Sequence, residues 1–145
     1  AAAIAAQLEE EKGDIRLVAL LDTLEYLKRG GRVSASTALV GGLLAIKPVV
    51  AVLNGEVAML GKARGSKNGN NLLVQEIQKT GGVDFGRPYL LGWAGLDDSL
   101  LQKYIADSAA LWTGHVDELP LGTVGGTIGT HVGPGAIAVA FFQKR

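Results

Sequence analysis

The sequence contains no cysteine, which excludes disulfide bonds, thiolate metal sites and cysteine nucleophiles. It also lacks an excess of either charge, because 14 Lys and Arg residues balance 14 Asp and Glu residues. A neutral chain has no long-range field that would gather nucleic acid or an anionic membrane. Long hydrophobic runs are missing as well, since the run from Ala38 to Ile46 is too short to span a bilayer. We therefore expect a soluble, cytoplasmic protein with no nucleic-acid partner and no membrane span.

What the chain does contain is the composition of one globular domain, with 145 residues of which 48% are hydrophobic and 19% charged. It opens with AAAIAAQLEE, which is typical of the middle of a helix, and its single methionine is Met59. We interpret residues 1–145 as a single domain of a longer protein. A further part of the natural protein is expected on the N-terminal side.

Apolar patterning predicts alternating strands and helices along the chain. Asn54-Gly55 lies between two β-prone runs and predicts a tight antiparallel hairpin. Asp22, with Glu25 at capping-box spacing, predicts the start of a short helix that Gly30-Gly31 ends. The other expected elements are helices over residues 1–11, from residue 34, through 72–77 and from residue 97, and strands over residues 14–21, 47–53, 56–60, 89–93, 116–124 and 136–142. Together they predict an α+β fold with a mixed, largely antiparallel sheet of about six strands and helices packed on it.

The glycine-rich segment from Gly125 to Gly135 carries the most informative polar residues. Its glycines allow sharp turns and exposed backbone N–H groups, so we expect an irregular loop between two strands. Thr127, Thr130 and His131 lie within this segment. Hydroxyl, imidazole and backbone donors together suit a bound carboxylate or phosphate. The residues alone leave open a plainer interpretation, which is a tight turn with a histidine at the surface.

The sequence does not match the common motifs of catalytic and metal sites. Five residues instead of four separate Gly55 from Gly61, and Ala63 replaces the hydroxyl that a P-loop requires. No Gly-x-Ser-x-Gly elbow is present. His115 and His131 are far apart in the sequence and have no cysteine near them, which disfavours a metal site. We therefore expect neither a catalytic centre nor a metal or other cofactor.

Three motifs in the same order resemble the DegV family of bacterial proteins. Leu21 to Ser34 reads LDTLEYLKRGGRVS and is similar to the family's segment from LDTL to GGRIS. Leu43 to Pro48 reads LLAIKP, and Ile128 to Ala136 reads IGTHVGPGA, and both are similar to family motifs. The three motifs span nearly the whole chain, so the resemblance is far more specific than any single glycine pattern.

This resemblance implies the C-terminal, lipid-binding domain of a two-domain protein whose N-terminal α/β domain lies outside this chain. Members of the family hold one long-chain fatty acid between their domains. Where their role is known, they are the fatty-acid-binding subunits of a fatty acid kinase and present the carboxylate to a separate ATP-using subunit. The resemblance therefore implies a non-catalytic carrier, whose partners are a long-chain fatty acid, a kinase subunit and its own N-terminal domain.

Roles for individual residues follow from the same resemblance. His131 takes the place of the family's carboxylate-binding histidine, with Thr130 beside it. Arg64 matches a basic position in a segment thought to meet the kinase subunit, although the residues after it are less basic than in the family. Without the resemblance, Arg64 and Lys67 would pass as ordinary cations of a solvated loop.

The apolar run that ends at Ile46 supplies candidate walls for the acyl chain, although simple core packing explains the same residues. The four candidates are Leu39, Leu43, Leu44 and Ile46. Burying about a dozen methylenes contributes on the order of 10 kcal/mol before entropic losses, so an apolar tunnel would supply most of the affinity.

Two other functions compete with the carrier. The family shares a distant fold likeness with dihydroxyacetone kinase, so a small-molecule kinase domain is the main alternative, although no nucleotide-binding motif supports it. A regulator associated with DNA is the other alternative, and the neutral charge disfavours it.

Overall fold

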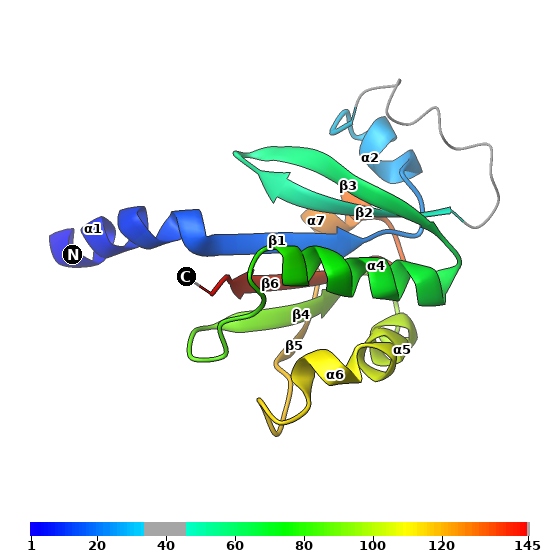
Figure 1. The fold of residues 1–145 in the computed structure, drawn as a ribbon. Helices are drawn as coiled ribbons and strands as arrows, with labels where there is room; N and C mark the ends of the chain where they lie inside the picture. The colour runs from blue at the N-terminus through cyan, green and yellow to red at the C-terminus, as the bar shows by residue number, and fades with distance from the viewer. Residues whose placement is uncertain (34–45, 145) are drawn as a thin grey trace.

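The computed structural model of the chain describes residues 1–33 and 46–144. Within these ranges, six strands form one sheet that has helices on both faces (Figure 1). The strands are β1 (Ile15–Leu20), β2 (Ile46–Leu53), β3 (Glu56–Arg64), β4 (Tyr89–Trp93), β5 (Leu121–Thr123) and β6 (Ile137–Phe142). The helices are α1 (Ala2–Glu11), the 3-10 helix η1 (Lys12–Asp14), α2 (Glu25–Arg29), α4 (Ser66–Lys79), α5 (Ser99–Asp107), α6 (Ala109–Trp112) and α7 (Gly126–Val132). The helix predicted from residue 34 lies outside the described residues.

The strand order in the sheet is β3-β2-β1-β6-β4-β5. Neighbouring strands are antiparallel except β4 and β5, which run parallel. The central pair joins distant parts of the chain, because β1 and β6 are in register from Ile15 opposite Phe142 to Leu20 opposite Ile137. The prediction of an α+β fold with a mixed, largely antiparallel sheet of about six strands is therefore confirmed.

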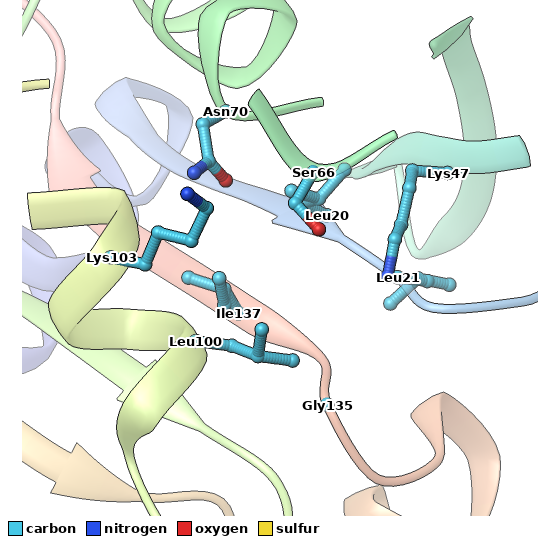
Figure 2. Close-up of a pocket in the computed structure, with 9 residues that line it drawn as sticks. All are labelled: Leu20, Leu21, Lys47, Ser66, Asn70, Leu100, Lys103, Gly135 and Ile137. Atoms are coloured by element: carbon cyan, nitrogen blue, oxygen red, sulfur yellow. The ribbon is translucent and has the colours of Figure 1, made fainter. Parts of the chain in front are cut away.

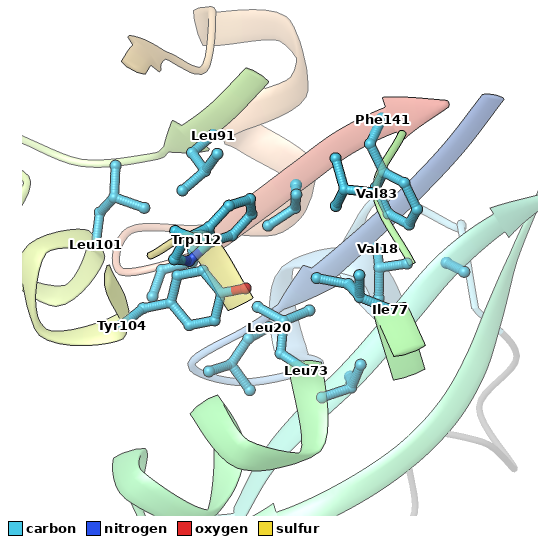
Figure 3. Close-up of a cluster of buried hydrophobic side chains, with 14 residues drawn as sticks. Val18, Leu20, Leu73, Ile77, Val83, Leu91, Leu101, Tyr104, Trp112 and Phe141 are labelled. Carbon is cyan, nitrogen blue, oxygen red and sulfur yellow. The ribbon is translucent and has the colours of Figure 1, made fainter. Parts of the chain in front are cut away.

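One face of the sheet carries the main hydrophobic core, which α4, α5 and α6 cover (Figure 3). Alternate residues of a strand point to one face, so Val18 of β1 and its partner Val139 of β6 are buried together. Leu73 of α4 and Tyr104 of α5 are completely buried against these strands. The other buried members of this core are Leu20, Val49, Ala51, Ile77, Val83, Leu91, Leu101, Trp112, Ile137 and Phe141.

The opposite face carries a smaller core beneath α2 and α7. Its buried members are Ala19, Leu21, Leu27, Val50, Ala94 and Ala136. Three of these six are alanines, so the helices on this face can lie close to the sheet. α2 and α7 cover only part of this face. Leu17 and Val52, which point to the same face, are 37% and 45% exposed.

The hairpin predicted at Asn54-Gly55 is confirmed. Asn54 has a φ of 53° and Gly55 a φ of 83°, which are the two positive values that a two-residue type I′ turn requires. The turn sets Leu53 opposite Glu56, and the pairing continues to Ile46 opposite Arg64. As a result, β3 runs four residues beyond the strand predicted over residues 56–60.

The predicted capping of α2 by Asp22 is wrong. The helix begins at Glu25 after Leu24, and the backbone N–H of Glu25 donates to Oγ1 of Thr23 at 3.2 Å. Asp22 instead forms an ion pair with Lys47, the second residue of β2. A carboxylate that follows a buried strand can pair across the sheet as readily as it can cap a helix, and the capping pattern does not separate the two outcomes.

Two other boundaries differ from the prediction. α4 begins at Ser66 and not near Leu72, because Gly65 has a φ of 78° and lets the chain turn directly from β3 into the helix. The strand predicted over residues 116–124 is reduced to Leu121–Thr123. The first turn of α4 is polar in sequence but packs against β1, since a Cβ at Gly69 would lie 2.9 Å from Cδ1 of Leu20.

The predicted helix over residues 1–11 is confirmed as α1, which extends away from the sheet and buries none of its residues (Figure 1). It is attached near its end, where Nη2 of Arg87 lies 2.6 Å from a carboxylate oxygen of Glu11. The guanidinium of Arg87 also lies 3.7 Å from the centre of the Phe142 ring. One arginine therefore links the end of α1 to the last residue of β6.

Tyr104 generates a prediction about stability. Its Oη is buried and makes no hydrogen bond of good geometry among the described residues, and burial raises the pKa of the phenol although the nearby Ser108 hydroxyl opposes the shift. We expect Tyr104→Phe to leave the free energy of unfolding at pH 7 unchanged or to raise it by up to about 1 kcal/mol, because the variant removes an unsatisfied hydroxyl. Urea unfolding of both proteins measures this difference.

The same pair of proteins should diverge at alkaline pH. Above pH about 10 the unfolded chain ionises this tyrosine while the folded chain keeps it neutral, which costs the wild type up to about 1.4 kcal/mol per pH unit. The phenylalanine variant lacks this loss. If the variant is instead less stable by more than about 1 kcal/mol at neutral pH, the hydroxyl makes a hydrogen bond that contributes to the fold.

Candidate functional site

The segment predicted as an irregular loop is a helix, which corrects the sequence interpretation. Gly125 is extended and precedes α7, while Gly133, with a φ of 78°, ends it. The backbone N–H groups of Gly129 and Gly133 donate to the carbonyls of Gly125 and Gly129, each at 2.8 Å. His131 therefore lies in the last turn of a helix and not on a loop. Local helical hydrogen bonds outweigh the conformational freedom of these glycines.

The imidazole of His131 lies against the C-terminal end of α2. A Cβ placed on Gly30 would be 2.1 Å from Nδ1 and 2.7 Å from Cε1 of this ring. Nδ1 is buried and has no hydrogen-bond partner among the described residues, although the side chain as a whole is partly exposed. One edge of the ring thus packs against the backbone of α2.

A second close approach holds the same two helices together. Gly133 requires glycine for its φ of 78°, and a Cβ there would also lie 2.3 Å from the ring of Tyr26. Tyr26 belongs to α2, so each helix packs an aromatic ring against a glycine at the end of the other. We name this arrangement the α2–α7 contact, and its members are Tyr26, Gly30, His131 and Gly133.

Thr130 precedes His131 on α7 and is exposed. Its hydroxyl donates to the backbone carbonyl of Thr127 at 2.8 Å. The single proton of this hydroxyl is therefore engaged within the helix, and Thr130 would have to rotate before it could donate to a carboxylate, which only accepts. Because the bond is exposed, water can replace it at little cost.

An ion pair and two hollows lie at the sheet end where β1 finishes and β6 begins. The side chain of Lys47 is 16% exposed and pairs with Asp22. A small hollow of about 10 Å³ has room for about one water molecule. Around it, Lys47 approaches from β2 and Lys103 reaches from α5 towards Asn70 (Figure 2). Nδ2 of Asn70 donates to Asp107 at 2.7 Å. The residues that line this hollow are Leu20, Leu21, Lys47, Ser66, Asn70, Leu100, Lys103, Gly135 and Ile137.

A larger hollow of about 410 Å³ opens beside the first. It lies between the turn that follows β4 and the connection from α7 to β6, and Asp22, Leu100 and Gly135 are among its walls. Neither of these two hollows is lined by His131 or Thr130. The candidate carboxylate residues and the hollows are thus separate features, and the segment Pro134–Ala136 connects them along the chain.

Two of the remaining predicted site residues, Arg64 and Ile46, lie on the β2–β3 hairpin and not on α7. Arg64 is exposed at the end of β3 and is in register with Ile46, which is half-buried at the start of β2. Leu39, Leu43 and Leu44 lie outside the described residues. Ile46 and Arg64 are therefore brought together by the hairpin, whereas His131 and Thr130 are held on α7.

His115, which the sequence disfavoured as a ligand, stacks on Phe85 with ring centres 4.6 Å apart. No group of three metal-ligating side chains occurs in residues 1–33 and 46–144. Within the same ranges, no helix is long and apolar enough to cross a membrane.

Sequence reasoning missed Gly30 and Tyr26, which complete the surroundings of His131. Gly30 lies in a Gly-Gly pair that was interpreted only as the end of a helix, and Tyr26 lies within that helix and was given no role. No local pattern reveals that α7 packs here, because this contact depends on strand pairing between distant parts of the chain.

Comparison with known proteins now identifies the family. The family model described as "Uncharacterised protein, DegV family" matches residues 1–144. The chain belongs to the DegV family. The resemblance carried by the three sequence motifs is thereby confirmed, and the fold described above is that of a DegV domain.

Curated DegV proteins from several bacteria are similar to this chain. A DegV domain-containing protein of Caldanaerobacter subterraneus is 30% identical over 132 residues, which cover 90% of this chain and 45% of that protein. One from Deinococcus radiodurans is 33% identical over 127 residues, which cover 83% of this chain and 42% of that protein. The chain therefore spans less than half the length of these relatives.

Solved structures of DegV proteins share the fold. One is a fatty-acid-binding DegV family protein from Thermus thermophilus, which is 29% identical to this chain with a TM-score of 0.76. The match covers 97% of this chain and 50% of that one. A fatty acid binding DegV protein from Streptococcus agalactiae is 25% identical with a TM-score of 0.77, covering 99% and 50%. The fatty acid kinase B3 protein of Streptococcus pneumoniae, loaded with linoleic acid, is 19% identical with a TM-score of 0.83, again covering 99% and 50%, and shows likeness of fold.

The ion pair between Asp22 and Lys47 generates a prediction. Because Lys47 is largely buried, Asp22→Asn leaves its ammonium without a charged partner, and we expect the free energy of unfolding to fall by about 1–3 kcal/mol. Glu25→Gln is the matched control, since the Glu25–Arg29 pair is exposed and should contribute less than about 0.5 kcal/mol. Chemical denaturation of the three proteins tests this, and equal effects of both variants would contradict it.

Proposed function

We propose that this chain is the lipid-binding part of a carrier that holds a long-chain fatty acid and presents its carboxylate to a separate kinase subunit. The observation that carries the proposal is the placement of His131, whose ring lies at the α2–α7 contact with one edge packed and with Nδ1 lacking a hydrogen-bond partner among the described residues. The fatty acid binding of the Thermus thermophilus relative, which matches 97% of this chain, supports the ligand class.

In this proposal His131 binds the carboxylate through Nε2. The other ring nitrogen, Nδ1, is buried against α2 and is not available to a ligand. A ring N–H that donates to a carboxylate offsets part of the cost of removing that charge from water. Thr130, one residue earlier on the same turn, adds a second donor after its hydroxyl leaves the carbonyl of Thr127.

The acyl chain supplies most of the binding free energy in this proposal. Each buried methylene contributes roughly 0.8 kcal/mol, whereas a hydrogen bond to a charged group contributes about 1.5–3 kcal/mol. Leu39, Leu43, Leu44 and Ile46 remain our candidates for the apolar wall. His131 therefore sets the position of the head group and the chain sets the affinity, which is the division of roles that a carrier needs.

The carrier is proposed to act with other parts rather than as an enzyme. The chain spans about half the length of its solved relatives, so we place its own N-terminal domain across the carboxylate. The ATP-using step is assigned to a separate subunit, because the sequence has no phosphate-binding loop of its own. We propose Arg64, exposed at the end of β3, as a contact for that subunit.

We expect His131→Ala to weaken fatty acid binding by roughly 10- to 150-fold, the range that corresponds to the loss of one hydrogen bond to a charge. Native mass spectrometry of the whole protein that contains this chain, followed by extraction of bound lipid, measures the occupancy. His115→Ala is the matched control, because His115 stacks on Phe85 and has no proposed role in binding.

The outcomes of that experiment separate the functions under consideration. One fatty acid per wild-type protein, with less in the His131 variant alone, supports the carrier. A folded wild-type protein without lipid contradicts it, and turnover of ATP by the protein alone would support a small-molecule kinase instead.

For Arg64→Ala we expect unchanged lipid content but several-fold slower phosphorylation of the bound fatty acid by the kinase subunit, because a rim charge mainly affects the encounter between proteins. The difference should shrink as salt concentration rises. Lys144→Ala is the control, since Lys144 follows β6 at the opposite end of the sheet. A loss of bound lipid in the Arg64 variant would contradict a role limited to the kinase contact.

A further inference from the structure

Gly30 and Gly31 end the same helix, but they do so for different physical reasons. Gly31 has a φ of 68°, and the N–H of Arg32 donates to the carbonyl of Leu27 at 2.8 Å while that of Gly31 donates to Lys28 at 3.0 Å. These are the two bonds of a Schellman motif, in which the residue at the position of Gly31 favours glycine. The backbone alone therefore accounts for Gly31.

The backbone does not account for Gly30. Its φ of −77° and ψ of −3° are values that any residue adopts without strain. What excludes a side chain there is the ring of His131, since a Cβ would lie 2.1 Å from Nδ1, well below ordinary van der Waals contact of about 3.5 Å. The absence of a side chain at Gly30 is what leaves room for the imidazole.

We propose that Gly30 is a positioning residue for His131, because its missing side chain fixes where the imidazole lies. The inference rests on the proposed function, in which His131 binds the fatty acid carboxylate. A methyl group at position 30 would push the ring more than about 1 Å from its place. Hydrogen bonds to the ring require heavy-atom distances of about 2.7–3.2 Å, so such a shift removes the bond to a carboxylate whose position the acyl chain has set.

Tyr26 and Gly133 limit how the ring can respond. The Tyr26 ring packs where a Cβ of Gly133 would lie, at 2.3 Å, two residues after His131. The close approach of Tyr26 to Gly133 fixes how near α7 lies to α2 at this point. We therefore expect the displacement caused by a larger residue at position 30 to fall mainly on the His131 side chain.

The test is a double-mutant cycle on the whole protein that contains this chain. Gly30→Ala should weaken fatty acid binding about as much as His131→Ala does, roughly 10-fold or more. In the His131→Ala background, where the ring is absent, Gly30→Ala should have almost no further effect on affinity. Gly31→Ala is the matched control: no atom of the described residues, its chain neighbours aside, lies within 4 Å of its Cβ position, so its strained φ should lower the melting temperature without changing the affinity.

A spectroscopic signal reports the position of the ring directly. The Cε1–Hε1 resonance of His131, assigned by its absence in His131→Ala, should shift in Gly30→Ala and stay in place in Gly31→Ala. If Gly30→Ala fails to fold but the double variant folds, the restored folding shows that the side chain at position 30 clashes with the imidazole of His131. Failure of both to fold would overturn the inference and make Gly30 purely structural.

The remaining outcomes distinguish this inference from the proposed function. If wild-type protein binds fatty acid and His131→Ala binds less, but Gly30→Ala binds normally or its effect adds fully to that of His131→Ala, then Gly30 does not position the ring. If the folded wild-type protein binds no fatty acid, the proposed function fails, and an unshifted His131 resonance in Gly30→Ala would independently overturn the positioning role.

Discussion

The pairing of β1 with β6 is the contact on which the candidate site depends. These strands come from opposite ends of the chain, yet they are in register from Ile15 opposite Phe142 to Leu20 opposite Ile137. α2 follows β1 and α7 precedes β6, so this register alone brings the two short helices to one end of the sheet. A slip of one residue would exchange the two faces of one strand relative to the other, so that side chains of the main core would lie beneath α2 and α7, where half of the buried residues are alanines.

The two faces of the sheet serve different purposes. Large side chains from α4, α5 and α6, including Leu73, Tyr104 and Trp112, fill one face and provide most of the apolar burial. The other face has small residues such as Ala19 and Ala136 beneath two helices of five and seven residues. Helices this short are marginal on their own, so the main core must hold the sheet in place for them. Stability resides on one face and the proposed chemistry on the other.

The sequence predicted those features that depend on local chemistry. Asn54-Gly55 defined its hairpin because a type I′ turn has few alternatives, and short apolar runs located β1, β4 and β6 within a residue or two. α7 was mistaken for a loop, because five glycines outweighed the weak helical signal of a seven-residue segment. The ion pair of Asp22 with Lys47 and the fit of Gly30 to His131 were beyond local patterns, since both join residues that only the tertiary fold makes neighbours.

The glycine at position 30 indicates how stability and function are balanced at this end of the sheet. In a conformation with φ near −77°, alanine would restrict the unfolded chain more than glycine does and would stabilise the fold by roughly 0.4–1 kcal/mol if space allowed. With glycine at position 30 the fold lacks this stabilisation. The same glycine lies beside the imidazole of His131, whose buried Nδ1 has no hydrogen-bond partner among the described residues. Two local losses of stability at one contact are difficult to explain by folding alone. They are explained if the ring must stand in one place to meet a ligand, since a site that binds a charged group tolerates such costs in return for fixed geometry.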